Sequence, residues 1–414
     1  MKPRKKILML VENVPAPADR RVWNEAMTLR DQGYQISIIS PKGTSKHGES
    51  YSLIENIHIY RYSLPAIEQK YLAYPVEYSV AMLMTFFLSL KVWRRHGFDI
   101  IHAANPPDMF FLIGLFYRIF GKKFVFDQHD LSPELFRVKF AHGIKPLYRL
   151  LLFLEKCSYQ TAHLIITSNL SQKQFALQRG HSQPDKVYVV RNGPNLGQIK
   201  LVTPEPDLKR GFSYLLAYVG LMDVQDGVEY CVYALHELVY RRGRRDVSLV
   251  LIGDGGRLAR LKALAHELKL DEYINFTGLL PTEDVVRYLT VADVGLIPDP
   301  RNGVNEYCTM IKTMEYMALG KPIVAFDLLE TRFSAGDAAL YATPNLVDDF
   351  ACQIETLLDH EGLRRQLGDT GRKSVVESLC WEETSKNLIL AYEKLVPFQS
   401  SLIRRNYVYS EKSR

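Results

Sequence analysis

Cysteine is scarce in this sequence, and the few cysteines lie far apart. The 414 residues contain only five, none in a Cys-x-x-Cys pair: Cys157, Cys231, Cys308, Cys352 and Cys380. An odd number of scattered cysteines argues against a disulfide framework and against a structural zinc site. The pattern therefore predicts a protein of a reducing compartment, the cytoplasm.

Several signatures of hydrolytic enzymes are also absent. There is no P-loop, because Gly320 and Lys321 are followed by Pro322. No His-Glu-x-x-His or Gly-x-Ser-x-Gly pattern occurs, which argues against a zinc protease and an α/β-hydrolase. No Asp-x-Asp pair is present to hold a magnesium-bound diphosphate. We therefore expect no metal and no cofactor, and we expect helix amides and cationic side chains to hold any diphosphate ligand.

Long hydrophobic runs are missing as well. The uncharged run 78–90 has 13 residues, whereas a helix needs roughly 18 to 20 to span a bilayer. The N-terminal apolar run 7–11 is too short for a signal peptide and predicts a buried strand. Two interpretations are open for the segment near 76–95: a helix that lies on a membrane surface, and a well-buried helix of an α/β domain.

Charge is unevenly distributed along the chain. Residues 1–200 carry 27 Lys and Arg against 15 Asp and Glu, a net +12, and the remainder carries a net −6. A basic half indicates an anionic partner. No nucleic-acid-binding motif accompanies this charge, so we expect no nucleic acid. An anionic membrane surface fits at least as well, with the protein peripheral at the inner face of the cell membrane.

The length and the patterning predict two α/β domains, because 414 residues exceed one ordinary core. Apolar strand-like runs alternate with helical patterns, which is typical of parallel sheets with crossover helices. Strands are predicted at 7–11, 35–40, 99–103, 123–126, 164–167 and 187–190, and then at 215–219, 247–252, 274–277, 294–297 and 323–326.

Domain boundaries follow from a break in this periodicity near Pro194, Pro204 and Pro206. We expect four segments: a Rossmann-like domain at 1–194, a linker at 195–212, a second Rossmann-like domain at 213–380, and a C-terminal helix and tail at 381–414 that pack back toward the first domain. In open parallel sheets, ligands bind beyond the carboxyl ends of the strands. The loops after each strand are therefore the places to search for chemistry.

Two such loops in the second domain are rich in glycine. The strand-like run "VSLVLI" leads into Gly253, Asp254 and Gly255, and Gly220 ends the preceding strand. Glycine lets a phosphate or ribose approach the backbone closely. The spacing of a dinucleotide fingerprint is absent, because Leu258 stands where its third glycine would be. A purely structural turn is the alternative interpretation.

The stretch "NEYCTMIKTMEYMALGKPIVAFD" opens a predicted helix after another strand. Thr309 is a suitable N-cap, so free amides are expected at Met310 and Ile311. Lys312 and Glu315 share one face of the helix. They suit a diphosphate and a ribose respectively, and a surface salt bridge between them is the alternative.

Polar side chains are dense in "KFVFDQHDLSPE", residues 123–134, at the end of a predicted strand. Asp127 and His129 alternate as strand neighbours do, which leaves a metal site, an acid–base pair or a wall of a binding site as interpretations. The metal interpretation lacks a second ligand group nearby in the sequence. Ser132 and Pro133 are expected to open a helix.

Taken in order, these stretches resemble the family 4 glycosyltransferases, which are retaining nucleotide-sugar enzymes of the GT-B fold. "DRRVWNEAMTLRDQGYQISIIS", "FDIIHAANPPDMFFL", "FVFDQHDLSPE" and "VVRNGPN" are similar to successive strand edges of their first domain. "YVGLMDVQDGVEY", "LVLIGDGG" and "EYMALGKPIVAFD" are similar to their donor-binding domain. The resemblance implies two Rossmann-like doubly wound parallel-sheet domains that face a cleft. It extends to bacterial polysaccharide-biosynthesis members.

The resemblance also implies site residues. His129, Lys312 and Glu315 are the expected catalytic residues, with Glu315 on the donor ribose and His129 facing the donor sugar across the cleft. The expected donor-binding residues are Asn192, Gly220, Gly253, Asp254, Gly255, Thr309, Lys312 and Glu315. The expected acceptor-side loop residues of the first domain are Asp19, Arg20, Arg21 and Asn105.

This sequence departs from the family pattern at three positions. The first glutamate of the family's Glu-x7-Glu motif falls at Tyr307. The Arg and Lys that bind the diphosphate fall at Leu221 and Asp226. Lys312 and the amides at the start of its helix are the expected substitutes.

We therefore expect a metal-independent retaining transfer from a UDP- or GDP-linked sugar to a glycan or a polyprenyl-diphosphate-linked acceptor in cell-surface polysaccharide biosynthesis. Catalysis would come from positioning and from stabilisation of the leaving diphosphate, with domain closure excluding water. Two alternatives remain: a nucleotide-sugar epimerase of the same shape, and a catalytically degenerate nucleotide-sugar-binding partner subunit.

Overall fold

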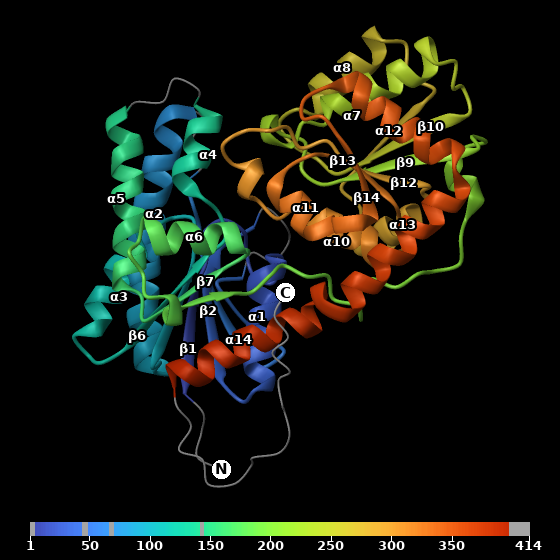
Figure 1. The fold of residues 1–414 in the computed structure, drawn as a ribbon. Coiled ribbons are helices and arrows are strands. Elements are labelled where there is room, and N and C mark those ends of the chain that lie inside the picture. The colour runs from blue at the N-terminus through green and yellow to red at the C-terminus, as the bar shows by residue number, and fades with distance from the viewer. Residues whose placement is uncertain (1–4, 44–48, 66–69, 141–144, 397–414) are drawn as a thin grey trace.

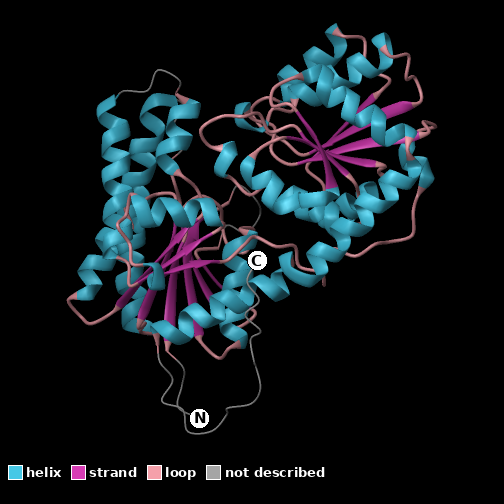
Figure 2. Ribbon diagram, viewed as in Figure 1, coloured by secondary structure: helices cyan, strands magenta, loops and turns pink. Residues whose placement is uncertain are grey.

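The computed structural model describes residues 5–43, 49–65, 70–140 and 145–396. Within these ranges the chain forms two α/β units, each with its own sheet and surrounding helices (Figures 1 and 2). The expected fold class, two doubly wound parallel-sheet domains, is confirmed. The strands are runs of buried apolar residues because helices cover both faces of a parallel sheet.

The first sheet has eight strands in the order β3-β4-β2-β1-β5-β6-β7-β8. All neighbours are parallel except β3 and β4, which form an antiparallel edge hairpin. The strands are β1 (Lys6–Leu10), β2 (Gln35–Pro41), β3 (Tyr51–Ile54), β4 (Ile57–Tyr62), β5 (Ile100–Ala104), β6 (Lys123–Gln128), β7 (Leu164–Thr167) and β8 (Val187–Val189). The helices are α1 (Arg20–Asp31), α2 (Lys70–Arg95), α3 (Phe111–Arg118), α4 (Ser132–Lys139), α5 (Lys145–Thr161) and α6 (Leu170–Gln178).

The second sheet has six parallel strands in the order β11-β10-β9-β12-β13-β14. They are β9 (Tyr214–Val219), β10 (Val247–Ile252), β11 (Ile274–Gly278), β12 (Val294–Ile297), β13 (Ile323–Phe326) and β14 (Ala339–Ala342). Its helices are α7 (Glu229–His236), α8 (Leu258–Glu267), α9 (Thr282–Val291), α10 (Ile311–Ala318), α11 (Leu329–Ala335), α12 (Val347–Asp359) and α13 (Glu361–Ser374). Between the two sheets, segment 195–212 holds the short turn Pro206–Lys209.

The last described helix, α14 (Trp381–Leu395), returns from the second domain to the first, as the red ribbon in Figure 1 shows. The indole N–H of Trp381 donates to Oγ1 of Thr28 in α1 at 3.0 Å. The hydroxyl of Tyr392 lies 2.7 Å from Nδ1 of His102 in β5. The tail 397–414 lies outside the described residues. The second domain is therefore joined to the first at both of its ends.

Both sheets change strand order next to their first strand. The chain adds β2 on one side of β1 and β5 on the other, and it adds β10 and β12 on opposite sides of β9. Open α/β sheets bind ligands in the crevice beyond such switch points. The sites to examine are therefore the loops beyond the carboxyl ends of β1 and β5 and of β9 and β12.

Helix α2 corrects two expectations about segment 76–95. Its segment Val76–Arg95 has a mean hydropathy of 1.3 and is long and apolar enough to cross a membrane by length and composition alone. The 13-residue uncharged run therefore gave too short an estimate of the apolar length of this helix. A well-buried helix is also wrong, because only 22% of the segment is buried. Ala81 and Thr85 pack the helix on the sheet, whereas Leu83 and Phe87 are exposed.

The β3–β4 hairpin and β14 escaped the sequence analysis. Strand β3 lies at the sheet edge with Tyr51 and Leu53 exposed, so it lacks the continuous apolar pattern of the central strands. Its turn residues Glu55 and Asn56 both have positive φ, 51° and 61°, as in a type I′ turn. Glutamate is an uncommon residue at such a position, so the turn carried no recognisable signal.

Candidate functional site

Loops of the two domains together enclose a pocket of about 170 Å³. Arg20 and Asn192 line it from the first domain, and Thr282, Ile311 and Glu315 line it from the second. Each of these residues lies in a connection after a parallel strand or in the first turns of the helix that follows. The pocket therefore occupies the edge at which open α/β sheets bind ligands.

Glu315 of α10 is joined to the first domain. Its Oε1 accepts a hydrogen bond from Nη1 of Arg20 at 2.8 Å, and the side chains are 11% and 62% exposed, respectively. Burial raises the pKa of Glu315, while the charge and hydrogen bond of Arg20 oppose that rise. Arg20 is exposed and can move away from Glu315. The carboxylate of Glu315 can then accept hydrogen bonds from the hydroxyls of a ligand instead.

Thr309 does not cap α10, contrary to expectation. Met310 occupies the N-cap position without a side-chain hydrogen bond. Instead, Oγ1 of Thr309 accepts from Nδ2 of Asn169 in the first domain at 3.0 Å, and the same nitrogen donates to the carbonyl oxygen of Tyr307 at 2.9 Å. The ring of Tyr307 packs edge-on against Phe175 with centroids 5.0 Å apart. Domain docking thus supplies the partner that the local sequence could not reveal.

Lys312 is paired inside the second domain and not with Glu315. Its Nζ lies 2.8 Å from Oδ2 of Asp299 and 4.6 Å from the ring centroid of Tyr218. Burial raises the pKa of Asp299 although Lys312 opposes the shift. Burial likewise raises the pKa of Asp226 to about 6, again against the charge of Lys312. The positive charge of Lys312 is therefore already balanced by carboxylates.

Contact between two loops explains the glycines that follow β9 and β10. A Cβ on Gly253 would lie 1.9 Å from the carbonyl oxygen of Gly220, and one on Gly255 would lie 2.6 Å from that of Met222. Asp254, between them, is exposed and its Oδ1 accepts from the backbone N–H of Gly255 at 2.8 Å. The structural interpretation therefore accounts for Gly253 and Gly255.

His129 follows β6 directly and forms an ion pair with Asp127. Its Nε2 lies 2.5 Å from Oδ2 of Asp127. Burial lowers the pKa of His129, but the charge and hydrogen bond of Asp127 outweigh it, so the pKa is raised. Burial raises the pKa of Asp127, yet Arg21, His129 and His102 hold it well below its ordinary range. Helix α4 begins at Ser132, as expected, and contacts the turn 224–226 of the second domain.

Arg21 is buried beside this pair and also lines the interdomain pocket. Its Nε and Nη2 donate to Asp127 at 3.2 and 2.7 Å. Its Nη1 donates to the carbonyl oxygen of Val190 at 2.8 Å and to Oδ1 of Asn192 at 2.5 Å. Nη2 also lies 3.2 Å from Oε1 of Glu25. Because these contacts use the guanidinium donors, Arg21 orients Asn192, and its neighbour Arg20 reaches the second domain.

Asn105 and Asp19 organise backbone near the same edge. Oδ1 of Asn105 accepts from the backbone N–H of His129 at 2.6 Å, and its Nδ2 donates to the carbonyl oxygen of Asp130 at 2.8 Å. Asp19 caps α1 by accepting from the backbone N–H of Val22 at 3.0 Å. Asn105 therefore fixes the loop that carries His129, and Asp19 fixes the start of the helix that carries Arg20 and Arg21.

The sequence analysis missed two acidic residues at the domain edges. Asp299 comes shortly after β12, a position that the strand pattern could have singled out. Glu330 is fully buried, accepts from Oγ of Ser171 at 2.6 Å and lies 3.8 Å from Nη2 of Arg191. Both of its partners belong to the first domain, so no local signal could have identified its role.

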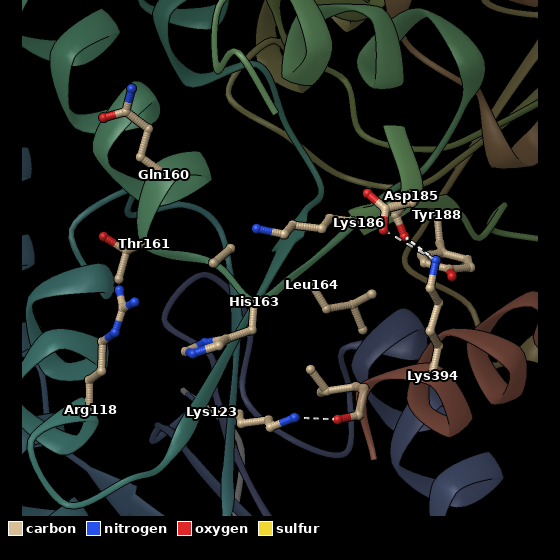
Figure 3. A pocket seen from close by; sticks show the side chains of 12 residues that line it. Arg118, Lys123, Gln160, Thr161, His163, Leu164, Asp185, Lys186, Tyr188 and Lys394 are labelled. Carbon is tan, nitrogen blue, oxygen red and sulfur yellow. Dashed lines mark hydrogen bonds and ion pairs between the residues drawn. The ribbon is translucent and has the colours of Figure 1, made fainter. Parts of the chain in front are cut away.

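A larger pocket, of about 290 Å³, lies at the opposite, amino-terminal edge of the first sheet. Figure 3 shows Arg118, His163 and Lys186 around it. Helices α3, α5 and α14 all end at this edge, and helix carboxyl ends attract cations. Nζ of Lys123 illustrates this by donating to the carbonyl oxygen of Leu395 at the end of α14. Lys123 of this pocket therefore complements a helix end.

Comparisons with known proteins agree on one class. A family model described as Glycosyltransferase Family 4 matches residues 18–198, and one described as Glycosyl transferases group 1 matches residues 213–360. An uncharacterized glycosyltransferase of Methanocaldococcus jannaschii is 22% identical over 88% of this chain and 91% of its own length. The MMP alpha-(1->4)-mannosyltransferase of Mycolicibacterium hassiacum is 30% identical over 40% of this chain and 39% of its own length.

Solved structures share the whole fold. Sucrose-phosphate synthase from Thermosynechococcus elongatus matches with a TM-score of 0.75 and 18% identity over 95% of this chain and 99% of its own. HepE of Anabaena, in complex with UDP and glucose, matches with a TM-score of 0.71 and 15% identity over 94% of this chain and 100% of its own. At such identities the likeness shows the fold, which is GT-B.

Proposed function

We propose that this chain, a glycosyltransferase with the GT-B fold, transfers a sugar from a UDP- or GDP-linked donor to a glycan or a polyprenyl-diphosphate-linked acceptor, with retention at the transferred carbon. The observation that carries the proposal is the interdomain pocket, in which Glu315 of one domain meets Arg20 of the other. Complexes of the structurally similar HepE with UDP and with UDP-glucose support a nucleotide-sugar as the donor class.

In this proposal the donor lies against the second domain. Glu315 accepts hydrogen bonds from the ribose hydroxyls once Arg20 releases it, because an ionised carboxylate offers only acceptors. Lys312 is held by Asp299, and Leu221 and Asp226 supply no cation. The exposed guanidinium of Arg20 is then available to the diphosphate as a charge-assisted donor. The scheme needs no metal and no cofactor.

Catalysis in this proposal depends on positioning and on charge stabilisation. The leaving diphosphate assists loss of the acceptor proton on the same face of the sugar, so no separate enzymic base is required. His129 and Asn192, at the ends of β6 and β8, form the wall of the first domain. Polar contacts such as Asn169 to Thr309 close the domains and exclude water.

The acceptor in this proposal belongs to cell-surface polysaccharide biosynthesis and is presented at the cytoplasmic face of the cell membrane. Support comes from the first domain, where α2 exposes Leu83 and Phe87, α3 exposes Leu112 and α5 exposes Phe153. The basic excess of the first 200 residues complements anionic lipids. An apolar helix face with cations nearby is suited to lie in the interface of a bilayer.

One observation favours a second candidate, a nucleotide-sugar-binding subunit without catalytic activity. The usual cations of the family are absent at Leu221 and Asp226, and Lys312 is neutralised by Asp299. Donor binding without transfer or hydrolysis would support this candidate.

The test combines ligand binding and turnover. UDP- and GDP-sugars are screened by thermal shift, in which a ligand at 100 times its Kd stabilises the protein by about 2.7 kcal/mol. The nucleotide-sugars that stabilise the protein are then incubated with lipid-linked acceptors, and the anomeric configuration of the product is determined by NMR. Glu315→Gln should weaken donor binding about 10- to 100-fold, because a hydrogen bond to a charged group contributes about 1.5 to 3 kcal/mol.

The control is Glu272→Gln, an exposed glutamate of the second domain that does not line the pocket. It should bind the donor as the wild type does. Equal donor affinity of Glu315→Gln and wild type would refute the donor site, and an inverted product would refute retention.

A further inference from the structure

Asp127 is the centre of a buried charge network in the first domain. Its two oxygens accept hydrogen bonds from Nε and Nη2 of Arg21, and Oδ2 is also hydrogen-bonded to Nε2 of His129. The same Oδ2 lies 3.4 Å from Nε2 of His102. Three cationic groups thus converge on one carboxylate that is fully buried. Burying a charged carboxylate costs free energy unless cationic groups pair with it, so the loss of any one of these contacts weakens the others.

Helices α1 and α14 and strand β5 contribute further groups to this network. Helix α1 contributes Glu25, which lies 3.2 Å from Arg21 and 3.2 Å from His102. Helix α14 contributes the Tyr392 hydroxyl, which lies 2.7 Å from Nδ1 of His102. The carboxyls of Asp19 and Asp130 are also close enough for their charges to interact with His129 and with each other. Burial lowers the pKa of His102, but the adjacent carboxylates of Asp127 and Glu25 raise it to about 9.

The network ends at His129, just after β6, and at Asn192, which lines the interdomain pocket. Asp127 contacts His129 directly, and through Arg21 it also orients Asn192, which lines the pocket beside Glu315. The guanidinium nitrogens of Arg21 all donate hydrogen bonds, to Asp127, to the carbonyl oxygen of Val190 and to Asn192. Neither Asp127 nor Arg21 therefore has a polar atom free for a ligand.

We propose that Asp127 is a positioning residue for sugar transfer, which holds His129 and, by way of Arg21, Asn192 in the orientation that the reaction uses. The inference rests on the proposed function. The Asp127 carboxylate at Nε2 favours the charged form of His129, in which Nδ1–H is the donor that remains for an oxygen of the sugar or the acceptor. Its side chain is 16% exposed, whereas that of Asp127 is 0% exposed.

A metal ion is not the explanation for this cluster. Ligand atoms of Glu25, His102 and Asp127 lie within 4.8 Å of one another. The guanidinium of Arg21, however, already contacts both carboxylates, at 3.2 and 2.7 Å. A cation of the protein itself therefore occupies the place that a metal would need.

The first experiment measures the ionisation of His129 without any substrate. Imidazole resonances are followed by NMR over pH 5 to 10 in the wild type, in Asp127→Asn and in Asp127→Glu, with His129→Gln for assignment. The wild-type ring should titrate above the ordinary value of 6.5. Asp127→Asn should titrate at lower pH, and Asp127→Glu should restore part of the shift.

The second experiment measures the pH profile of transfer. Asp127→Asn should lower kcat at least ten-fold at neutral pH, with little change in KM for the donor, and it should move the alkaline limb to lower pH. Glu155→Gln is the control, because Glu155 is a buried acidic residue of the same domain that lies beside Arg179 and not beside His129. It should leave the His129 titration unchanged.

The outcomes separate the inference from the function on which it rests. A wild-type His129 that titrates at or below 6.5 overturns the positioning role even if Asp127→Asn fails to fold. An unchanged titration in a folded Asp127→Asn overturns it as well. Absence of transfer by the folded wild type, with the expected titration, overturns the proposed function instead.

Discussion

At the scale of single residues, one lysine lies close to two aspartates at the carboxyl edge of the second sheet. Lys312 lies 2.8 Å from Asp299, and Asp226 is near enough for both charges to shift its pKa. When both aspartates are ionised, the three side chains carry one net negative charge. A diphosphate placed beside them is repelled unless the surroundings change protonation or supply a cation.

Asp226→Asn should therefore tighten binding of a nucleotide-sugar. The pKa of Asp226 is about 6, so in the wild type this carboxyl becomes neutral as the pH falls below 6 and becomes charged above it. Wild-type affinity for UDP-glucose should rise roughly three- to ten-fold from pH 7.5 to 5.5, and Asp226→Asn should show the higher affinity at both values. A nucleotide-sugar is the right probe because its diphosphate diester stays fully ionised over this range.

Isothermal calorimetry at both pH values measures this prediction. Asp254→Asn serves as the control, because it removes a charge from the neighbouring exposed loop. It should retain the pH dependence of the wild type. Weaker binding of UDP-glucose by Asp226→Asn would show that Asp226 is a ligand-binding group and not a source of repulsion.

At the scale of elements, α14 determines how the ends of the chain meet. The helix leaves the second domain at Trp381 and buries Leu388, Ala391 and Tyr392 in the core of the first domain. Its amphipathic pattern is visible in the sequence, but its partner is not. The helix carries the hydroxyl that reaches His102, so docking of α14 also completes the network around Asp127.

Leu388→Ala should destabilise the first domain by about 2 to 5 kcal/mol, because it leaves a cavity at a fully buried position. Urea unfolding followed by tryptophan fluorescence isolates this effect, since all three tryptophans, Trp23, Trp93 and Trp381, lie in the first domain or in α14. Leu390→Ala is the matched control on the same helix, where the side chain is 50% exposed. It should change stability by about 0.5 kcal/mol or less, and equal effects of the two would contradict the docking.

At the scale of the whole molecule, the two domains are held by polar contacts between loops, by the packing of Tyr307 on Phe175 and by α14. Arg20 with Glu315, Asn169 with Thr309 and Ser171 with Glu330 all cross the interface. Polar interfaces of this kind suit domains that separate and close again. The exposed apolar faces of α2, α3 and α5 lie on the first domain alone, so a membrane would hold that domain and leave the second free to move.

A surface contact with lipid makes a testable prediction for the whole chain. The protein should sediment with vesicles that contain anionic lipid at low salt, and less so at high salt. Leu83→Asp combined with Phe87→Asp should reduce the vesicle-bound to free ratio at least ten-fold, since each buried apolar side chain contributes about 1.5 to 3 kcal/mol. Leu279→Asp removes an apolar side chain that is 75% exposed on the second domain and should change nothing. Equal loss in both variants would contradict docking through α2.

Much of the fold could be predicted from local pattern. The runs 7–11 and 35–40 correspond to β1 and β2, and 247–252 coincides with β10, because a strand buried on both faces needs a continuous apolar run. The edge strand β3 has no such need, since solvent reaches Tyr51 and Leu53. It was missed for that reason. The burial of α2 was misjudged because composition does not reveal which stripe of a helix packs on the sheet.

The sequence by itself determined the two parallel sheets, their order along the chain and the loops that carry Glu315, Lys312 and His129. These features depend on residues within one element or one turn, where side-chain period and glycine or proline positions are decisive. Tertiary structure alone decided the partners of those side chains. Arg20 meets Glu315 across 295 positions, and Asp127 meets Arg21 across 106. Pairing over such distances is set by the docking of domains and the burial of charge, and neither leaves a trace in local sequence.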